Sequence, residues 1–183
     1  MAKSAKYLLI GSIEAYSGKS GTILGMTHQL TDKGVVVAYG KPLGTYLSDG
    51  DAGTVEEDVR FIAQTLNLSE QQVLSPLLCL DGETISRRLQ GQDTTDYCQL
   101  LRGYTQKLAG DLVLLEGPGT LCEGSLFQLS VEHMMQEVDA LLLLVTRYSS
   151  LLLVDELLKA KQSFGERLVG VVINDIPPEL LEV

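Results

Sequence analysis

The amino-acid sequence predicts an α/β domain with a doubly wound, mainly parallel sheet and helices on both faces of that sheet. Five short runs rich in Val, Ile and Leu are bounded by glycine or polar turns, as strands buried on both faces are. Segments with apolar residues at helical spacing lie between these runs. Strands that alternate with helices along a chain pair in parallel, and this order therefore predicts the architecture.

The expected elements follow one another along most of the chain. The five strands are placed at residues 7–11, 35–39, 112–116, 140–146 and 168–174. Helical spacing is carried by Ile23, Met26 and Leu30 before Gly34, by Val59, Ile62, Ala63 and Leu66, and by Leu151, Val154 and Leu158 before Gly165. Met134, Met135 and the leucines of residues 151–153 are expected in the core or in a subunit interface.

Two parts of the chain depart from the alternation. Residues 68–110 are polar and helical in pattern and contain Pro76, and we expect them to form a helical insertion within the domain. Further on, Pro177 and Pro178 precede a segment, from Glu179, that has the start of another helix. We therefore expect residues 1–183 to form a single domain at the N-terminal end of a longer protein.

Composition and charge restrict the partners of this domain. The 183 residues include 24 acidic and 14 basic side chains, for a formal net charge of −10. This acidity argues against nucleic acid or an anionic membrane as the main partner, because like charges repel. The three cysteines are widely separated and the two histidines have no partner at metal-ligand spacing, which argues against disulfide and zinc frameworks. With no apolar run of membrane-spanning length and no signal-peptide pattern, we expect a cytoplasmic protein.

The most specific motif is the loop between the first strand and the first helix. Residues 11–20 read GSIEAYSGKS, which ends like the phosphate-binding pattern G-x-x-x-x-G-K-[ST] but has Ile13 where that pattern begins with glycine. In such a loop Lys19 would neutralise phosphate charge and Ser20 would bind Mg²⁺. The alternative is an ordinary helix start capped by a serine, Ser17 or Ser20. The residues expected to contact a nucleotide are Ser17, Gly18, Lys19, Ser20 and Gly21.

Polar residues also stand near the ends of later strands, where a doubly wound sheet binds its ligand. Lys41 and Thr45 follow the second strand, and a second cation beside a phosphate loop suits an anion site; the alternative for Lys41 is a solvated turn. Asp58 opens a helix and Glu116 ends the third strand, and both carboxylates suit Mg²⁺, although the helix dipole also favours Asp58. Asn174, at the end of the fifth strand, offers a donor and an acceptor to a base.

In their order along the chain, these segments resemble the dethiobiotin synthetase-like branch of P-loop NTPases, most of all the nucleotide-binding module at the front of phosphotransacetylase-type proteins. The resemblance implies a homodimer that binds ATP and Mg²⁺, with a further domain after this one. It also implies the role of each residue: Lys19 and Ser20 at phosphate and Mg²⁺, Asp58 and Glu116 at Mg²⁺, Asn174 at adenine, and Lys41 and Thr45 beside a substrate carboxylate or carbamate.

The loop departs from the synthetase pattern at one position. The synthetases carry an acid two residues before the glycine of the loop, where this chain has Tyr16, and Glu14 is displaced. We therefore favour a Mg²⁺-dependent ATP-binding domain with a regulatory role. Two alternatives remain open: an ATP-dependent ligase or kinase that phosphorylates a small carboxylate or carbamate with Lys19, Lys41 and Thr45, and a structural or partner-binding module in which the loop is idle.

Overall fold

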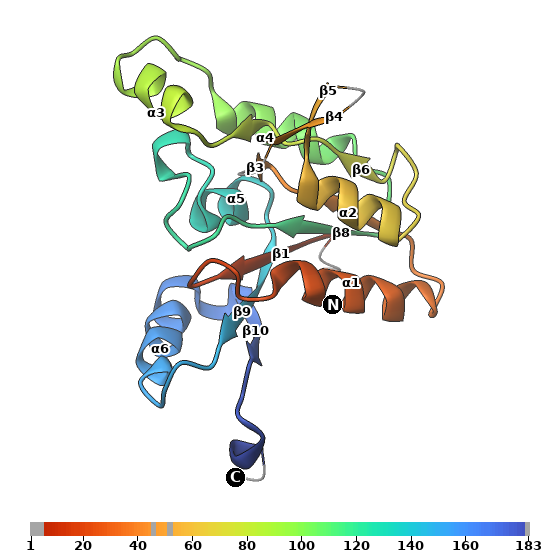
Figure 1. Ribbon diagram of the computed structural model, residues 1–183, viewed down its shortest axis with the longest axis vertical. Coiled ribbons are helices and arrows are strands. Elements are labelled where there is room, and N and C mark those ends of the chain that lie inside the picture. The colour runs from red at the N-terminus through yellow and green to blue at the C-terminus, as the bar shows by residue number, and fades with distance from the viewer. Residues whose placement is uncertain (1–5, 45–46, 51–52, 182–183) are drawn as a thin grey trace.

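The computed structural model describes residues 6–44, 47–50 and 53–181. Within these residues the main sheet has six strands in the order β10-β9-β1-β8-β2-β6, and every neighbouring pair is parallel (Figure 1). The strands are β1 (Tyr7–Ser12), β2 (Val37–Gly40), β6 (Val73–Leu74), β8 (Leu112–Glu116), β9 (Leu141–Arg147) and β10 (Leu168–Asn174). The predicted α/β architecture with a parallel sheet is confirmed.

Helices cover both faces of the sheet, because each central strand sends apolar side chains in both directions. On β1, Leu9 packs into one apolar cluster and the next residue, Ile10, packs into the other. The Ile10 cluster also holds side chains of α1 (Lys19–Thr31) and α2 (Glu57–Thr65). The Leu9 cluster holds side chains of α4 (Tyr97–Gln106), α5 (Val131–Glu137) and α6 (Leu153–Phe164). This two-sided burial explains why the strands read as continuous apolar runs.

The segment 68–110 contains short strands as well as helices. It holds β6, β7 (Leu78–Cys79), α3 (Gly82–Leu89) and α4. Strand β6 extends the main sheet beside β2, and β7 pairs with β3 (Leu43–Gly44). A separate antiparallel hairpin, β4 (Leu47–Gly50) and β5 (Gly53–Glu56), leads from the β2 region to the start of α2.

The apolar segment before α6 differs from the prediction. Leu153 is buried at the start of the helix, but Leu151 and Leu152 lie in the preceding turn and are 82% and 74% exposed. These two leucines therefore do not lie in the core, whereas the subunit interface that the sequence also left open for them stays a prediction. Met134 and Met135 are buried on α5, as expected. After Pro177 the described chain forms a single 3₁₀ turn, Pro178–Leu180.

Among the described residues, no helix combines the length and the apolar character that a membrane crossing needs.

Candidate functional site

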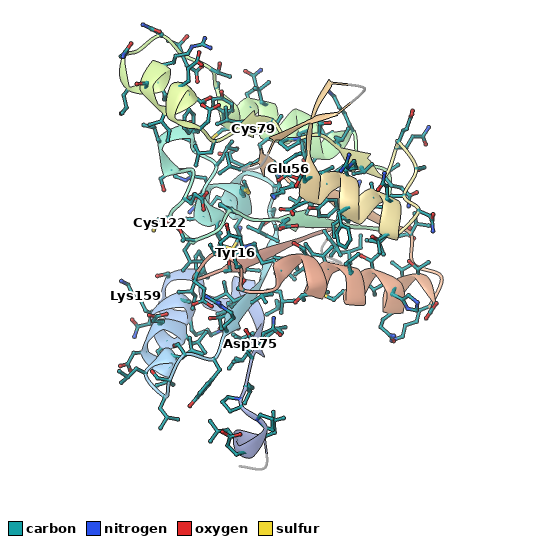
Figure 2. The ribbon with its side chains drawn as sticks, in the orientation of Figure 1. Tyr16, Glu56, Cys79, Cys122, Lys159 and Asp175 are labelled. Atoms are coloured by element: carbon teal, nitrogen blue, oxygen red, sulfur yellow. The ribbon has the colours of Figure 1, made fainter. Side chains whose placement is uncertain are left out.

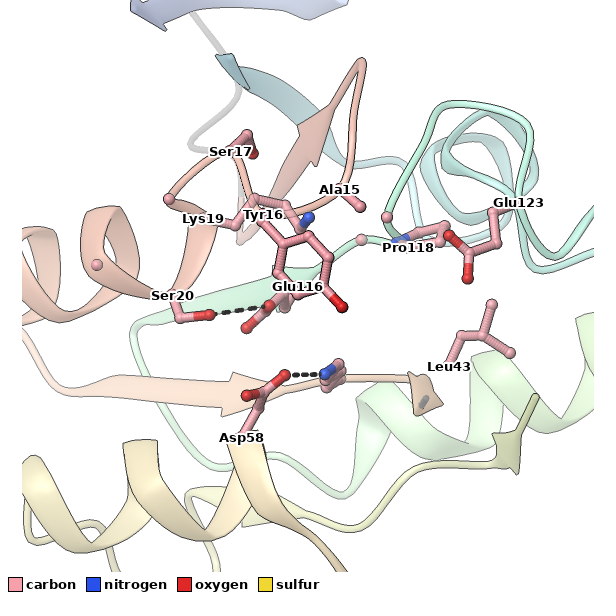
Figure 3. Close-up of a pocket in the computed structure, with 15 residues that line it drawn as sticks. Ala15, Tyr16, Ser17, Lys19, Ser20, Leu43, Asp58, Glu116, Pro118 and Glu123 are labelled. Atoms are coloured by element: carbon pink, nitrogen blue, oxygen red, sulfur yellow. Dashed lines mark hydrogen bonds and ion pairs between the residues drawn. The ribbon is translucent and has the colours of Figure 1, made fainter. Parts of the chain in front are cut away.

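A pocket of about 630 Å³ opens at the carboxyl ends of β1, β2 and β8, next to the first turns of α1 and α2 (Figure 3). This is the edge at which doubly wound sheets bind their ligands. The loop after β1 forms one wall of the pocket and the segment after β8 forms another. The lining residues are Ala15, Tyr16, Ser17, Gly18, Lys19, Ser20, Gly21, Lys41, Leu43, Asp58, Glu116, Gly117, Pro118, Gly119 and Glu123.

The loop between β1 and α1 presents an uncapped helix N-terminus. Gly18 precedes the helix in the left-handed conformation, with φ of 97°, and no side chain caps the first turn. The alternative in which Ser17 or Ser20 serves as a helix cap is therefore wrong. Ser17 Oγ is buried and has no hydrogen-bond partner in the described part of the chain. Free N–H groups at the positive end of a helix, beside an unsatisfied hydroxyl, form a site for an anion.

Lys19 brings a cation to this loop. It is 8% exposed, and its Nζ donates a hydrogen bond of 2.9 Å to Ser12 Oγ, which in turn donates to the carbonyl oxygen of Gly119 at 3.0 Å. Burial lowers the pKa of Lys19, and the Glu116 carboxylate acts in the opposite direction. Because the hydrogen bond goes to a neutral hydroxyl, and no ion pair with Lys19 forms among the described residues, its charge remains available to a ligand in the pocket.

Glu116 lies at the end of β8 between two hydroxyl groups. Its Oε1 accepts a hydrogen bond of 3.2 Å from Ser20 Oγ, and its Oε2 accepts one of 2.7 Å from the hydroxyl of Tyr39. The side chain is almost fully buried, and this burial raises its pKa, whereas the cations of Lys41 and Lys19 oppose the rise. The buried carboxylate therefore depends on Tyr39, Ser20 and the two lysines for its stability as an anion.

Lys41 pairs with two carboxylates, that of buried Glu56 and that of Asp58, whose side chain is 44% exposed. Its Nζ contacts Glu56 Oε1 and Asp58 Oδ2, and the side chains of Lys41 and Glu56 are 5% and 0% exposed. Glu56 also accepts a hydrogen bond of 2.8 Å from the backbone N–H of Val59 and so caps α2. Burial acts to lower the pKa of Lys41, but Glu116, Asp58 and Glu56 together outweigh it, and the pKa is raised. The charge of Lys41 is thus already compensated within the protein.

Comparison with known families identifies the chain. The model of an AAA domain family, AAA_26, matches residues 6–182. The chain belongs to this AAA domain family. It is therefore a P-loop nucleotide-binding domain by family, in agreement with the parallel sheet and the loop before α1.

Solved structures with a similar fold come from several kinds of protein. The signal recognition particle receptor FtsY from Elizabethkingia anophelis is 16% identical, with a TM-score of 0.56 over 94% of this chain and 51% of that chain. The same receptor in complex with GDP is 13% identical, with a TM-score of 0.57 over 94% of this chain and 49% of that one. The kinase domain of the Escherichia coli tyrosine kinase ETK is 14% identical, with a TM-score of 0.53 over 97% and 71%. The AAA domain thus spans about half the length of the FtsY chains, and the likeness shows the fold alone.

Most of the residues predicted for the site of the AAA domain gather around the pocket. They are Ser17, Gly18, Lys19, Ser20, Gly21, Lys41, Asp58 and Glu116. Asn174 is an exception: it lies behind the loop, where its Nδ2 donates a hydrogen bond of 2.8 Å to the carbonyl oxygen of Ser17. Thr45 lies outside the described residues. In the described part of the chain no three His, Cys, Asp or Glu side chains are grouped as a metal site. Ser20, Asp58 and Glu116, the residues predicted for Mg²⁺, line the same pocket.

Several residues of the AAA domain site were not predicted from the sequence. Tyr39 supports Glu116 from β2, Glu56 holds Lys41, and Glu123 extends its side chain into the pocket beside Pro118 (Figure 3). The available signal for Tyr39 was that it is the one tyrosine in a buried strand. The available signal for Glu56 was that it stands just before a helix that begins with two more acids. Arg147, at the end of β9, pairs with Glu14, with 3.7 Å between Nε and Oε1.

Proposed function

We propose that this AAA domain binds ATP together with Mg²⁺ and that the binding serves a regulatory role. The observation that carries the proposal is the combination of an uncapped α1 N-terminus, the ammonium group of Lys19, which forms no ion pair among the described residues, and the unsatisfied Ser17 Oγ. Each of these groups costs free energy in the absence of an anion, and a polyphosphate satisfies all of them together. Figure 2 labels Tyr16, which belongs to this loop, near the middle of the view.

The residues present fit a magnesium ion. Ser20 Oγ and Glu116 Oε1 lie 3.2 Å apart at the floor of the pocket, and Asp58 lines the same pocket. Mg²⁺ prefers oxygen ligands and takes one or two carboxylates from a protein, with the remainder from phosphate and water. Ser20 and Glu116 would hold the ion, which would neutralise phosphate charge, and Asp58, whose Oδ2 contacts Lys41, would approach it with its other oxygen.

Asn174 supports adenine over guanine. Because its Nδ2 donates to Ser17, the acceptor Oδ1 is the part of the amide that remains for a base. Adenine presents an amino group at its position 6, which is a donor, whereas guanine presents a carbonyl oxygen there, which is an acceptor. Asn174 does not line the pocket, so a base would meet this amide oxygen only by extending past the loop, and in that arrangement the oxygen would favour ATP.

The state of Lys41 favours a regulatory role over phosphorylation of a carboxylate or carbamate. An anionic substrate would have to compete with both Glu56 and Asp58 for the ammonium group, and Glu56 is fully buried beside it. A ligase or kinase that resembles dethiobiotin synthetase would need the ammonium group of Lys41 to contact its substrate rather than Glu56 and Asp58. We further propose that the domain forms a homodimer across the nucleotide face and that nucleotide changes its shape or association state.

Titration calorimetry of ATP into the purified domain, with and without Mg²⁺, tests the proposal. We expect binding that requires Mg²⁺ and is lost in Lys19→Ala, because the phosphate charge then has no cation in the loop. Lys159→Ala is the matched control, because Lys159 is an exposed lysine on α6 (Figure 2). Equal binding by Lys19→Ala and Lys159→Ala would refute the phosphate role of the loop.

Two further measurements separate the finer parts of the proposal. GTP should bind more weakly than ATP, and equal affinity for the two nucleotides would refute the proposal that Asn174 selects adenine over guanine. Steady-state ATP hydrolysis that rises strongly with acetate or another small carboxylate would favour the ligase or kinase over the regulatory domain.

A further inference from the structure

The phosphate loop contains a residue in a conformation that needs external support. Tyr16 has φ of 59°, in the left-handed region, and Gly18 follows it with φ of 97°. Glycine adopts this conformation readily, but tyrosine does so only when the surrounding structure holds it there. Contacts of the residues on either side of Tyr16 provide part of that support.

Glu14 provides support before Tyr16. Its Oε1 accepts a hydrogen bond of 2.7 Å from the backbone N–H of Arg147 and one of 3.2 Å from Thr146 Oγ1. Both donors belong to the last two residues of β9, a strand buried in the main sheet. The loop is thus attached to the end of β9 through Arg147, which is 133 residues away from Glu14 in sequence.

A second attachment lies after Tyr16. The carbonyl oxygen of Ser17 accepts the hydrogen bond from Asn174, at the end of β10, and a Cβ on Gly18 would lie 2.4 Å from the same amide nitrogen. The backbone around Tyr16 is therefore held on both sides by neighbouring strands. Glu14 does not line the pocket. Its negative charge therefore does not face an anion bound there.

We propose that Glu14 is a positioning residue of the phosphate loop. By accepting hydrogen bonds from the end of β9, its carboxylate fixes residues 13–17 in the conformation that presents their backbone to phosphate. Phosphate loops of the pattern G-x-x-x-x-G-K-[ST] begin with a glycine turn that restrains the loop, but this chain has Ile13 at that position. The hydrogen bonds of Glu14 supply the restraint instead. The part of this inference that concerns ATP affinity rests on the proposed function, whereas the part that concerns loop order does not.

Three variants separate the hydrogen bond from the charge. Glu14→Ala removes the acceptor, Glu14→Gln keeps an oxygen acceptor but no charge, and Arg147→Ala keeps the backbone donor but removes the guanidinium at 3.7 Å. Hydrogen bonds to a charged acceptor are stronger than those to a neutral one, and Glu14→Ala removes two of them. We therefore expect Glu14→Ala to weaken MgATP binding by about tenfold to a hundredfold. Glu14→Gln, which keeps a neutral acceptor, should lose about tenfold or less in affinity and always less than Glu14→Ala, and Arg147→Ala should stay within about threefold of the unmodified chain. Glu156→Ala, an exposed acid on α6, is the control.

Amide hydrogen exchange of the nucleotide-free protein tests the same inference without any ligand. We expect residues 14–18 to exchange at least about tenfold faster in Glu14→Ala, with unchanged exchange in β8 and with rescue in Glu14→Gln. A change that only destabilised the fold would accelerate β8 as well. Unchanged loop exchange in Glu14→Ala, or a Glu14→Gln variant as impaired as Glu14→Ala, would overturn the positioning role. Failure of the unmodified chain to bind ATP would refute the proposed function and leave this exchange result to decide the role of Glu14.

Discussion

Replacement of Tyr39 by phenylalanine isolates the support that a single hydroxyl gives to the carboxylate of Glu116. Tyr39 is fully buried, and its hydroxyl donates the 2.7 Å hydrogen bond to Glu116 Oε2. Phenylalanine keeps the ring and leaves no large cavity, so that the loss is confined to the hydrogen bond. A hydrogen bond to a charged group contributes about 1.5–3 kcal/mol, and we expect Tyr39→Phe to lower the free energy of unfolding at neutral pH by that amount.

The pH dependence of this loss provides a second test. Burial already raises the pKa of Glu116, and the hydrogen bond from Tyr39 opposes the rise, so its removal raises this pKa further. The folded protein then binds the Glu116 proton more tightly than the unfolded chain does, and the free energy of unfolding increases as the pH falls toward the raised pKa. Once Glu116 is protonated, the variant lacks only a neutral hydrogen bond. The deficit should therefore shrink to about 0.5–1.5 kcal/mol in acid.

Urea unfolding at a series of pH values measures both quantities, and Tyr104→Phe is a matched control. The hydroxyl of Tyr104 is similarly buried, but it donates to the uncharged carbonyl oxygen of Leu74 at 3.0 Å. We expect Tyr104→Phe to cost about 0.5–1.5 kcal/mol with no dependence on pH between about pH 5 and pH 8. If Tyr39→Phe costs no more than Tyr104→Phe, or if its cost does not change with pH, the electrostatic account of Glu116 is wrong.

Two further substitutions examine the loop and the lysine cluster. Gly18→Ala should lower the free energy of unfolding by about 1–2 kcal/mol and weaken ATP binding, because φ is 97° and the new Cβ would displace Asn174. Gly25 lies in the middle of α1 with open space around it, and Gly25→Ala should therefore raise the free energy of unfolding by about 0.5–1 kcal/mol in the same urea assay. Equal effects of the two glycine substitutions would contradict this reasoning. Lys41→Met should cost about 3–5 kcal/mol, because buried Glu56 loses its counter-charge, and Glu56→Gln in the same chain should restore part of the loss. Losses that simply add in the double variant would show that the two side chains are not coupled.

The sequence was sufficient to predict the parts of the fold that depend on local pattern. Strands β8 and β10 have the predicted bounds, and β1, β2 and β9 differ by one or two residues at their ends. The central strands β1, β2, β8 and β9 are largely buried, so their apolar runs are continuous and end where the chain must turn. Strand β10, at the edge of the sheet, has an equally apolar run although Val169 and Val171 on it are 53% and 38% exposed. Leu151 and Leu152 show the limit of this reasoning: an apolar pattern indicates a helix but does not tell at which residue the helix begins.

The contacts within the site depend on separations that no local pattern contains. Lys41 meets Glu56 only because the β4–β5 hairpin returns the chain to the start of α2, and Tyr39 meets Glu116 only because β2 pairs with β8. The sequence therefore placed each predicted side chain at an element end, but not its partner. It indicated a lysine for a ligand at position 41, whereas the fold surrounds that lysine with acids.

The attachments of the phosphate loop also bear on when the site forms during synthesis. The loop lies within the first 20 residues, but its partners Gly119, Arg147 and Asn174 are 107, 133 and 157 residues away from the loop residues they bind. A ribosome-bound chain that has exposed only α1 and β2 already contains the whole motif, yet it lacks every one of these partners. Contacts of such long range also close late in folding, because the loss of chain entropy precedes the gain. An ordered phosphate loop in this domain is thus a sign that the strand at the far end of the sheet has docked.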